Sequence, residues 1–192
     1  MVEKFTNHTL KDAMFQILVI AGMRDTVYTP NVTIKDQIVP GGFNKGVCHG
    51  IPYNKYAHAI NNMAGNAGLF STIDNMANYM QLMLNKGRLN LTKVFNEDIV
   101  GNYTTAITEK KYNNTYARGW ETVPVSNPPC GQKFSKHSFG LADTSGSYIW
   151  ADKDKNVSIV LLANGDFPIP RKTVPADFQA KLSDAIMTAL GY

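Results

Sequence analysis

The chain has 192 residues, of which 44% are hydrophobic and 18% charged, and this composition is typical of a globular protein and excludes a disordered chain. Its net charge of +4 is scattered along the sequence rather than clustered, so we expect no nucleic-acid partner. The most apolar stretch near the start, residues 13–23, is shorter than the roughly 20 residues that a membrane span needs, so we expect no such span.

The first predicted element is a helix that covers residues 10–21. Thr9 can cap its N-terminus and Gly22 can end it. Its apolar positions recur at helical spacing and are Leu10, Ala13, Met14, Ile17, Leu18 and Ala21. The polar face of this helix is not basic, so we interpret it as a core helix rather than a membrane-surface anchor.

Residues 24–62 show little periodicity and are expected to be loops. Within them, Gly46-Val47-Cys48-His49-Gly50 has the outline of a cysteine nucleophile elbow. That motif needs a strand before it and a helix after it, and Pro52 interrupts the second, so we favour a loop cysteine over catalysis by Cys48. Cys48 and Cys130 could pair in an oxidising compartment, but we expect two unlinked thiols.

Three further helices are predicted. The clearest begins with Ser71 as N-cap and Asp74 three residues later, carries a methionine stripe that is typical of core filling, and ends at Gly87. A short helix is expected over residues 96–105. The last, over residues 175–190, has Pro175 near its first turn and is expected to lie across a sheet.

Residues 138–164 contain the strongest strand signals. Residues 146–152 are β-branched and aromatic, residues 152–156 form a polar hairpin loop, and residues 159–163 are an unbroken apolar run. The run is typical of a strand that is covered on both faces, so we expect it at the centre of a sheet. A hairpin this apolar needs further strands and helices on its faces.

Six N-glycosylation sequons occur in the chain, and they would suit a secreted eukaryotic protein. The sequence is rich in asparagine, so chance supplies several of them. Their acceptors are Asn7, Asn31, Asn90, Asn102, Asn113 and Asn156.

Five segments have recognisable patterns, in this order along the chain: Ala21-Gly22-Met23-Arg24-Asp25-Thr26, the stretch Ala67–Gly87, Arg118-Gly119-Trp120-Glu121, Leu162-Ala163-Asn164 and Phe167-Pro168-Ile169-Pro170. Together they resemble the penicillin-recognising serine hydrolases, in the branch of class C β-lactamases, esterases and D-alanyl carboxypeptidases. The resemblance implies an α+β fold (α/β sandwich), with an antiparallel sheet flanked by helices. Tyr112-Asn113-Asn114 spells the family's Tyr-x-Asn motif but lies on the wrong side of the Ala67–Gly87 helix, so we interpret it as chance.

Enzymes of this family use an acyl-serine route. A Ser-x-x-Lys motif supplies the nucleophile, a Tyr-x-Asn motif moves the proton, and a Lys-Thr-Gly or His-Ser-Gly strand donates one oxyanion-hole N–H. No serine in this chain is followed by lysine three residues later. We therefore expect residues 1–192 to be one partial domain that lacks the N-terminal helix and strands. Residues 1–117 would be mostly helix and loop, and residues 118–192 antiparallel strands and the last helix.

Two positions are open for the third motif. The β-lactamase spacing places it on Ser138-Phe139-Gly140, where the glycine would let substrate lie against the strand, and the esterase spacing on Leu141-Ala142-Asp143. We prefer the first. His137 would replace the missing cation if a one-residue bulge turned it inward, and is otherwise a surface histidine. Arg171 and Asn164 are the candidates for contact with the substrate, although the simpler interpretation of Arg171 is an exposed arginine after a proline loop.

The leading hypothesis is the C-terminal segment of a serine hydrolase that acts on a β-lactam, D-alanyl peptide, ester or amide and is not catalytic alone. The alternative is a non-catalytic binding or scaffolding protein of the same fold, and a cysteine hydrolase is remote. We expect no metal and no cofactor, and a secreted or periplasmic location. The strand at residues 156–164 should have one unpaired side, open to the missing N-terminal segment or to a second copy.

Overall fold

The computed structural model describes most of the chain, and the described residues form two compact units. The first unit draws on residues 1–78 and 164–172, and the second on residues 79–163 and 173–192. The division falls within helix α4 (Ile73–Leu84). The described ranges are 2–41, 47–52, 54–108, 115–123, 128–143, 145–165, 167 and 177–192.

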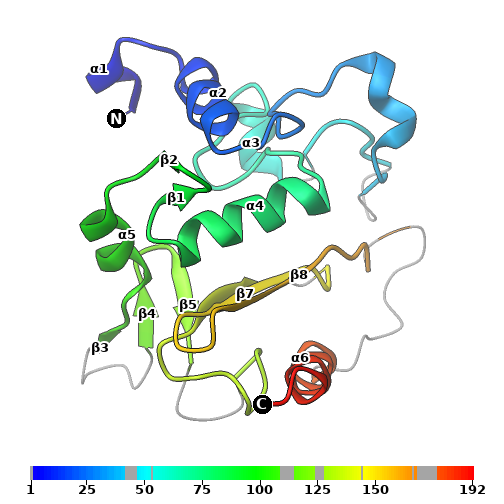
Figure 1. The fold of residues 1–192 in the computed structure, drawn as a ribbon. Coiled ribbons are helices and arrows are strands. Elements are labelled where there is room, and N and C mark those ends of the chain that lie inside the picture. Colours follow the sequence, from blue (N-terminus) through cyan, green and yellow to red (C-terminus); the bar gives the residue numbers. More distant parts are fainter. Residues whose placement is uncertain are drawn as a thin grey trace. The chain divides into compact units, whose positions relative to one another are not determined.

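The first unit is built from helices and loops (Figure 1). It contains α1 (Val2–Thr6), α2 (Leu10–Ile20), the 3-10 helix η1 (Val32–Gln37), α3 (Lys55–Ala59) and the beginning of α4. The prediction for α2 is confirmed: the Thr9 hydroxyl accepts a hydrogen bond from the Asp12 N–H at 3.2 Å, and Gly22 follows the helix with a φ of 69°.

Helix α4 begins one residue later than predicted. Its N-cap is Thr72 rather than Ser71, because the Thr72 hydroxyl accepts the Asn75 N–H at 3.3 Å. Ser71 is engaged elsewhere: its hydroxyl lies 2.8 Å from that of Thr26. A tertiary contact therefore takes the side chain that the local sequence pattern assigned to the cap.

The second unit contains a six-stranded sheet whose neighbours are all antiparallel and follow chain order. Its strands are β3 (Ile107–Thr108), β4 (Thr115–Ala117), β5 (Trp120–Thr122), β6 (Phe139–Ala142), β7 (Tyr148–Asp152) and β8 (Val157–Leu161). The unit also holds the hairpin of β1 (Arg88–Leu89) and β2 (Thr92–Lys93), α5 (Glu97–Thr104) and α6 (Phe178–Ala189). The predicted short helix is α5. Helix α6 begins at Phe178, and Pro175 lies outside the described residues.

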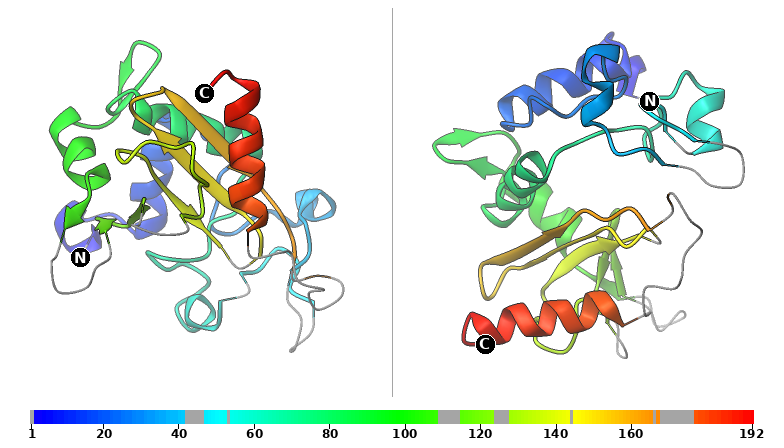
Figure 2. Two further views of the ribbon diagram at one scale, coloured as in Figure 1. Left: turned by 90° about the horizontal axis from the view of Figure 1, so that it is seen from below. Right: turned by 90° about the vertical axis from the view of Figure 1, so that its right-hand side faces the viewer.

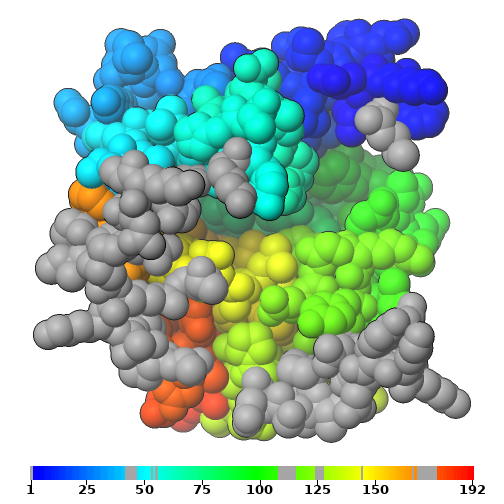
Figure 3. Space-filling model, turned by 180° about the vertical axis from the view of Figure 1, so that it is seen from behind, coloured from blue at the N-terminus to red at the C-terminus, as the bar shows by residue number. Residues whose placement is uncertain are grey.

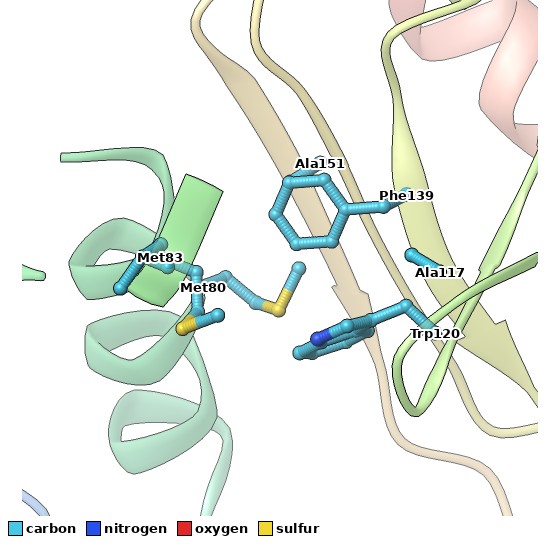
Figure 4. Packing of buried hydrophobic residues seen from close by; sticks show 7 residues of the cluster. Met80, Met83, Ala117, Trp120, Phe139 and Ala151 are labelled. Carbon is cyan, nitrogen blue, oxygen red and sulfur yellow. The ribbon is translucent and has the colours of Figure 1, made fainter. Parts of the chain in front are cut away.

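One face of the sheet packs against the end of α4 that belongs to this unit (Figure 4). Met80 and Met83 of α4 lie beside Trp120, Phe139 and Ala151. The rings of Trp120 and Phe139 meet edge to face with centroids 5.1 Å apart. The predicted core role of the α4 methionines is confirmed.

The opposite face of the sheet packs against α6 (Figure 2), as predicted. Met187 of α6 belongs to the same buried cluster as Tyr148, Trp150 and Cys130, and the Ser183 hydroxyl donates to the Tyr148 hydroxyl at 3.2 Å. In the space-filling view, red atoms of α6 lie next to yellow atoms of the strand region (Figure 3).

Strand β8 is the last strand of the described sheet and pairs there only with β7. Its predicted unpaired side is confirmed, whereas its predicted position at the centre of the sheet is wrong for the described strands. The strand also ends at Leu161 rather than Ala163. Beyond Leu161, the Ala163 N–H and C=O bond to the Ser147 hydroxyl, at 3.2 Å and 3.0 Å, so a side chain replaces the backbone ladder.

Candidate functional site

Strand β6 carries the predicted third-motif residues and is paired on both sides. Its register places Gly140 opposite Glu121 of β5 and Trp150 of β7, and Phe139 opposite Ala151. Because side chains alternate along a strand, Phe139 lies on the α4 face and the Trp150 ring on the α6 face. The site is therefore fixed by a three-strand ladder.

Ser138 directly precedes β6 and is 1% exposed. Its hydroxyl oxygen accepts the indole N–H of Trp150 at 2.9 Å. A buried indole N–H needs such a partner, since leaving it unpaired costs about 1–3 kcal/mol. The Ser138 hydroxyl therefore serves as the acceptor for a buried indole N–H and is not accessible to solvent.

Gly140 lies against the ring of Trp150. A Cβ added at this position would fall well inside van der Waals contact with the Trp150 ring carbons and with the backbone carbonyl oxygen of Ile149. The carbonyl is fixed by the ladder and cannot move aside. The packing of the strand therefore requires glycine here, whether or not substrate lies along it.

His137 is exposed and is directed to the turn between β7 and β8. Its Nδ1 lies 2.9 Å from Oδ2 of Asp154. This hydrogen bond is the main cause that lowers the pKa of the Asp154 carboxyl. His137 and Ser138 are neighbours in the sequence, but their side chains have separate partners: Asp154 for His137 and Trp150 for Ser138.

Asp152 organises this end of the sheet, a role that the sequence patterns did not reveal. Its carboxylate is fully buried and accepts the Ser135 N–H at 2.6 Å and hydroxyl at 2.8 Å, and the N–H groups of Asp154 and Lys155 at 2.9 Å and 3.2 Å. It therefore joins the segment that leads into β6 to the β7–β8 turn. The polar residues that follow β7 indicate a turn, and so make the hydrogen bonds from Asp154 and Lys155 predictable. The hydrogen bonds from Ser135 join distant parts of the chain, and no local pattern indicates them.

Asn164, a predicted substrate contact, belongs to the first unit. Its side-chain amide donates to the carbonyl oxygen of Pro40 at 2.8 Å. The other predicted contact, Arg171, lies outside the described residues. Both assignments stay predictions.

Two of the family-like segments meet in the first unit through Asn75, which is buried. Its amide oxygen accepts the Asp25 N–H at 3.1 Å and the Thr26 hydroxyl at 3.2 Å, and its amide nitrogen donates to Thr72 at 2.8 Å. The segment 21–26 is thereby tied to the start of α4.

The two thiols are both free, as predicted. Cys130 is buried, and desolvation is the first cause that raises its pKa to about 12, so its thiol is protonated at neutral pH. Cys48 is half-buried and its backbone bridges to Gly41. Gly46 of the elbow outline lies outside the described residues.

A hollow of about 580 Å³ opens in the second unit, between the end of α4, α5 and the β7–β8 turn. The Lys153 ammonium at its wall donates to the Thr104 carbonyl at 2.8 Å, and desolvation lowers the pKa of Lys153. None of the predicted site residues lines this hollow.

Within the described ranges, no group of three or more His, Cys, Asp or Glu side chains could hold a metal ion. Among the helices described, none is long and apolar enough to span a membrane.

This chain aligns with only part of the length of the known proteins to which it is similar. The "Putative D-alanyl-D-alanine carboxypeptidase" of Escherichia coli strain K12 is 30% identical over 112 residues, which are 57% of this chain and 25% of that protein. A protein of the same name from Salmonella gallinarum is 30% identical over 109 residues, 56% of this chain and 24% of that protein. The match therefore spans about a quarter of the length of these relatives.

Solved structures share the fold. A beta-lactamase from Mycobacterium bovis superposes with a TM-score of 0.59 at 16% identity, over 100% of this chain and 60% of that chain. A structure described as a class C beta-lactamase gives 0.63 at 19% identity, over 94% of this chain and 53% of that chain. This likeness confirms the predicted α+β fold.

The family model described as "Beta-lactamase" matches residues 1–183. The chain belongs to the beta-lactamase family.

Proposed function

We propose that residues 1–192 are the C-terminal segment of a serine hydrolase that acts through an acyl-serine, and that they are not catalytic without further polypeptide. The substrates in view are a D-alanyl peptide, a β-lactam, an ester or an amide. The names of the curated relatives favour a peptide that ends in D-alanine.

The absence of a Ser-x-x-Lys motif from the sequence carries this proposal. An acyl-serine needs a hydroxyl activated by a neighbouring base, and no serine here has lysine at that spacing. The fold relatives support it, because about 47% of the class C enzyme has no counterpart in this chain. The unpaired side of β8 supports it as well, because an edge this apolar is ordinarily covered.

In the proposed whole protein, Ser138-Phe139-Gly140 holds the position of the third motif. His137, Arg171 and Asn164 are the candidate contacts to the substrate. The unpaired side of β8 would be covered by preceding polypeptide or by a second copy. We also place the protein outside the cytoplasm, secreted or periplasmic.

The test compares residues 1–192 with a longer product translated from the same messenger. Both are assayed with nitrocefin, a p-nitrophenyl ester and a peptide ending in D-alanyl-D-alanine. We expect turnover only in the longer product, abolished when the serine of its Ser-x-x-Lys motif is changed to alanine. Turnover by residues 1–192 that is lost in Ser138→Ala would overturn the proposal.

A second candidate, a non-catalytic binding protein of the same fold, is favoured by one observation. The only hydroxyl at the preferred third-motif position is buried and bonded to Trp150, where the family pattern has a cation and a hydroxyl that face substrate. A longer product that contains Ser-x-x-Lys and still hydrolyses none of the three substrates would select this candidate.

The partner of β8 is tested separately by light scattering after size-exclusion chromatography. A second copy on the edge predicts a dimer that dissociates when proline replaces Ser158, because proline removes a strand N–H and is tolerated only at edges and bulges. A folded monomer would exclude the second copy and leave the preceding polypeptide as the proposed partner.

A further inference from the structure

The sequons of this chain are more frequent than its composition explains. It contains 18 asparagines and 23 serines and threonines among 192 residues, for which chance supplies about two sequons. Six are present. This excess is independent of the fold, and it directs attention to where the acceptor asparagines lie.

All five sequon asparagines in the described part of the chain are exposed, whereas only four of the nine other described asparagines are. Asn113, the sixth acceptor, lies outside the described residues. Asn90 sits in the turn of the β1–β2 hairpin and Asn156 in the turn before β8, both with a φ of 52°. The acceptors therefore gather at surface positions that tolerate a bulky substituent.

The middle residues of two sequons also indicate that these sites carry an attached group. Leu91 and Val32, 97% and 83% exposed, are the two most exposed large apolar side chains among the described residues. Each follows an acceptor directly, Asn90 and Asn31. A sugar attached to the acceptor would cover apolar surface that is otherwise left in water.

We propose that the exposed acceptors carry N-linked glycans, with Asn31 and Asn90 as principal sites. The donor is an oligosaccharide linked through a diphosphate to a polyprenyl lipid. The bond from C1 of the first sugar to the diphosphate oxygen breaks, and the lipid diphosphate leaves with the bonding pair. The asparagine Nδ2 forms the new bond to C1 and loses one proton.

This reaction leaves local structure intact. The Asn31 side-chain oxygen accepts the Thr33 N–H at 3.0 Å and caps η1, and glycosylation retains that oxygen. No side-chain hydrogen bond of Asn90 is present among the described residues, so nothing is lost there. The glycans thus add to the surface without competing with a fold contact.

The test is cell-free translation with endoplasmic-reticulum microsomes of residues 1–192 preceded by a cleavable secretory signal. Glycosylation precedes folding, so the readout does not depend on a stable product. We expect a gel shift that a peptide N-glycosidase removes, and Asn31→Gln and Asn90→Gln should each lose one step of it. Thr92→Ala should match Asn90→Gln, because it removes the hydroxyl of that sequon.

Asn85→Gln is the matched control, because Asn85 is exposed but is followed by Lys86-Gly87 and is not a sequon. It should leave the gel shift unchanged. The proposal is overturned by the absence of any glycosidase-sensitive shift. It is equally overturned by a shift that both Asn31→Gln and Asn90→Gln leave intact.

Discussion

Gly140→Ala tests whether the glycine of the candidate third motif is required by packing. The new Cβ would overlap the Trp150 ring and the Ile149 carbonyl oxygen, and β6 is held on both sides by β5 and β7. Overpacking of this kind costs about 3 kcal/mol, and the lower entropy of the unfolded alanine chain returns somewhat less than 1 kcal/mol. We expect the free energy of unfolding of the second unit to fall by about 2 kcal/mol, which lowers the urea midpoint by about 1 M.

Tryptophan fluorescence is a suitable probe, because both tryptophans of the chain, Trp120 and Trp150, lie in the second unit. Gly101→Ala is the matched control. Gly101 is exposed within α5, and a Cβ there meets nothing within 4 Å. Alanine is favoured over glycine in a helix by up to about 1 kcal/mol, so this variant should be unchanged or more stable. If Gly140→Ala unfolds at the same urea concentration as the parent, the packing argument is wrong. The interpretation that glycine is present so that substrate can lie against the strand is then favoured.

Three further predictions follow from the same unit. Ser138→Ala leaves the buried indole N–H of Trp150 without an acceptor and should cost about 1–3 kcal/mol; in the Trp150→Phe background the same change should cost far less, as a double-mutant cycle would measure. Asp152→Asn should destabilise the chain by a similar amount, about 1–3 kcal/mol, because the amide nitrogen cannot accept hydrogen bonds from Ser135, Asp154 and Lys155. An unchanged urea midpoint would contradict the role of Asp152 in joining these segments. Burial raises the pKa of Cys130 to about 12, so the thiol of the unfolded chain ionises first as pH rises above 9.0. The unfolded state then binds fewer protons than the folded state, and the free energy of unfolding should fall by about 1 kcal/mol by about pH 10. Cys130→Ala should flatten this alkaline slope, Cys48→Ala should not, and a thiol reagent should modify only Cys48 in the native protein.

Local sequence signals predicted the elements whose ends are determined locally. Helix α2 begins after Thr9 and ends before Gly22, because the cap hydrogen bond and the left-handed glycine involve only neighbouring residues. The methionine spacing of α4 predicted its buried face for the same reason. The apolar run after residue 156 predicted that β8 is a strand, but it placed that strand wrongly at the centre of the sheet; the unpaired side was predicted from the family resemblance instead.

The remaining features depend on contacts between distant segments. Ser71 looked like the cap of α4, but Thr26 takes its hydroxyl and Thr72 caps instead. Just beyond the end of β8, Ala163 bonds to the hydroxyl of Ser147, which lies sixteen residues before it in the chain. No spacing rule reveals that the Ser138 hydroxyl is used by Trp150, because that bond depends on the register of β6 and β7.

The most direct test of the proposed function is the intact mass of residues 1–192 after incubation with a penicillin, with a class C beta-lactamase as positive control. The proposal requires that no serine of this chain becomes acylated, so the mass should stay unchanged at every time point. A stoichiometric adduct that peptide mapping places on any serine between residues 1 and 192 would contradict it.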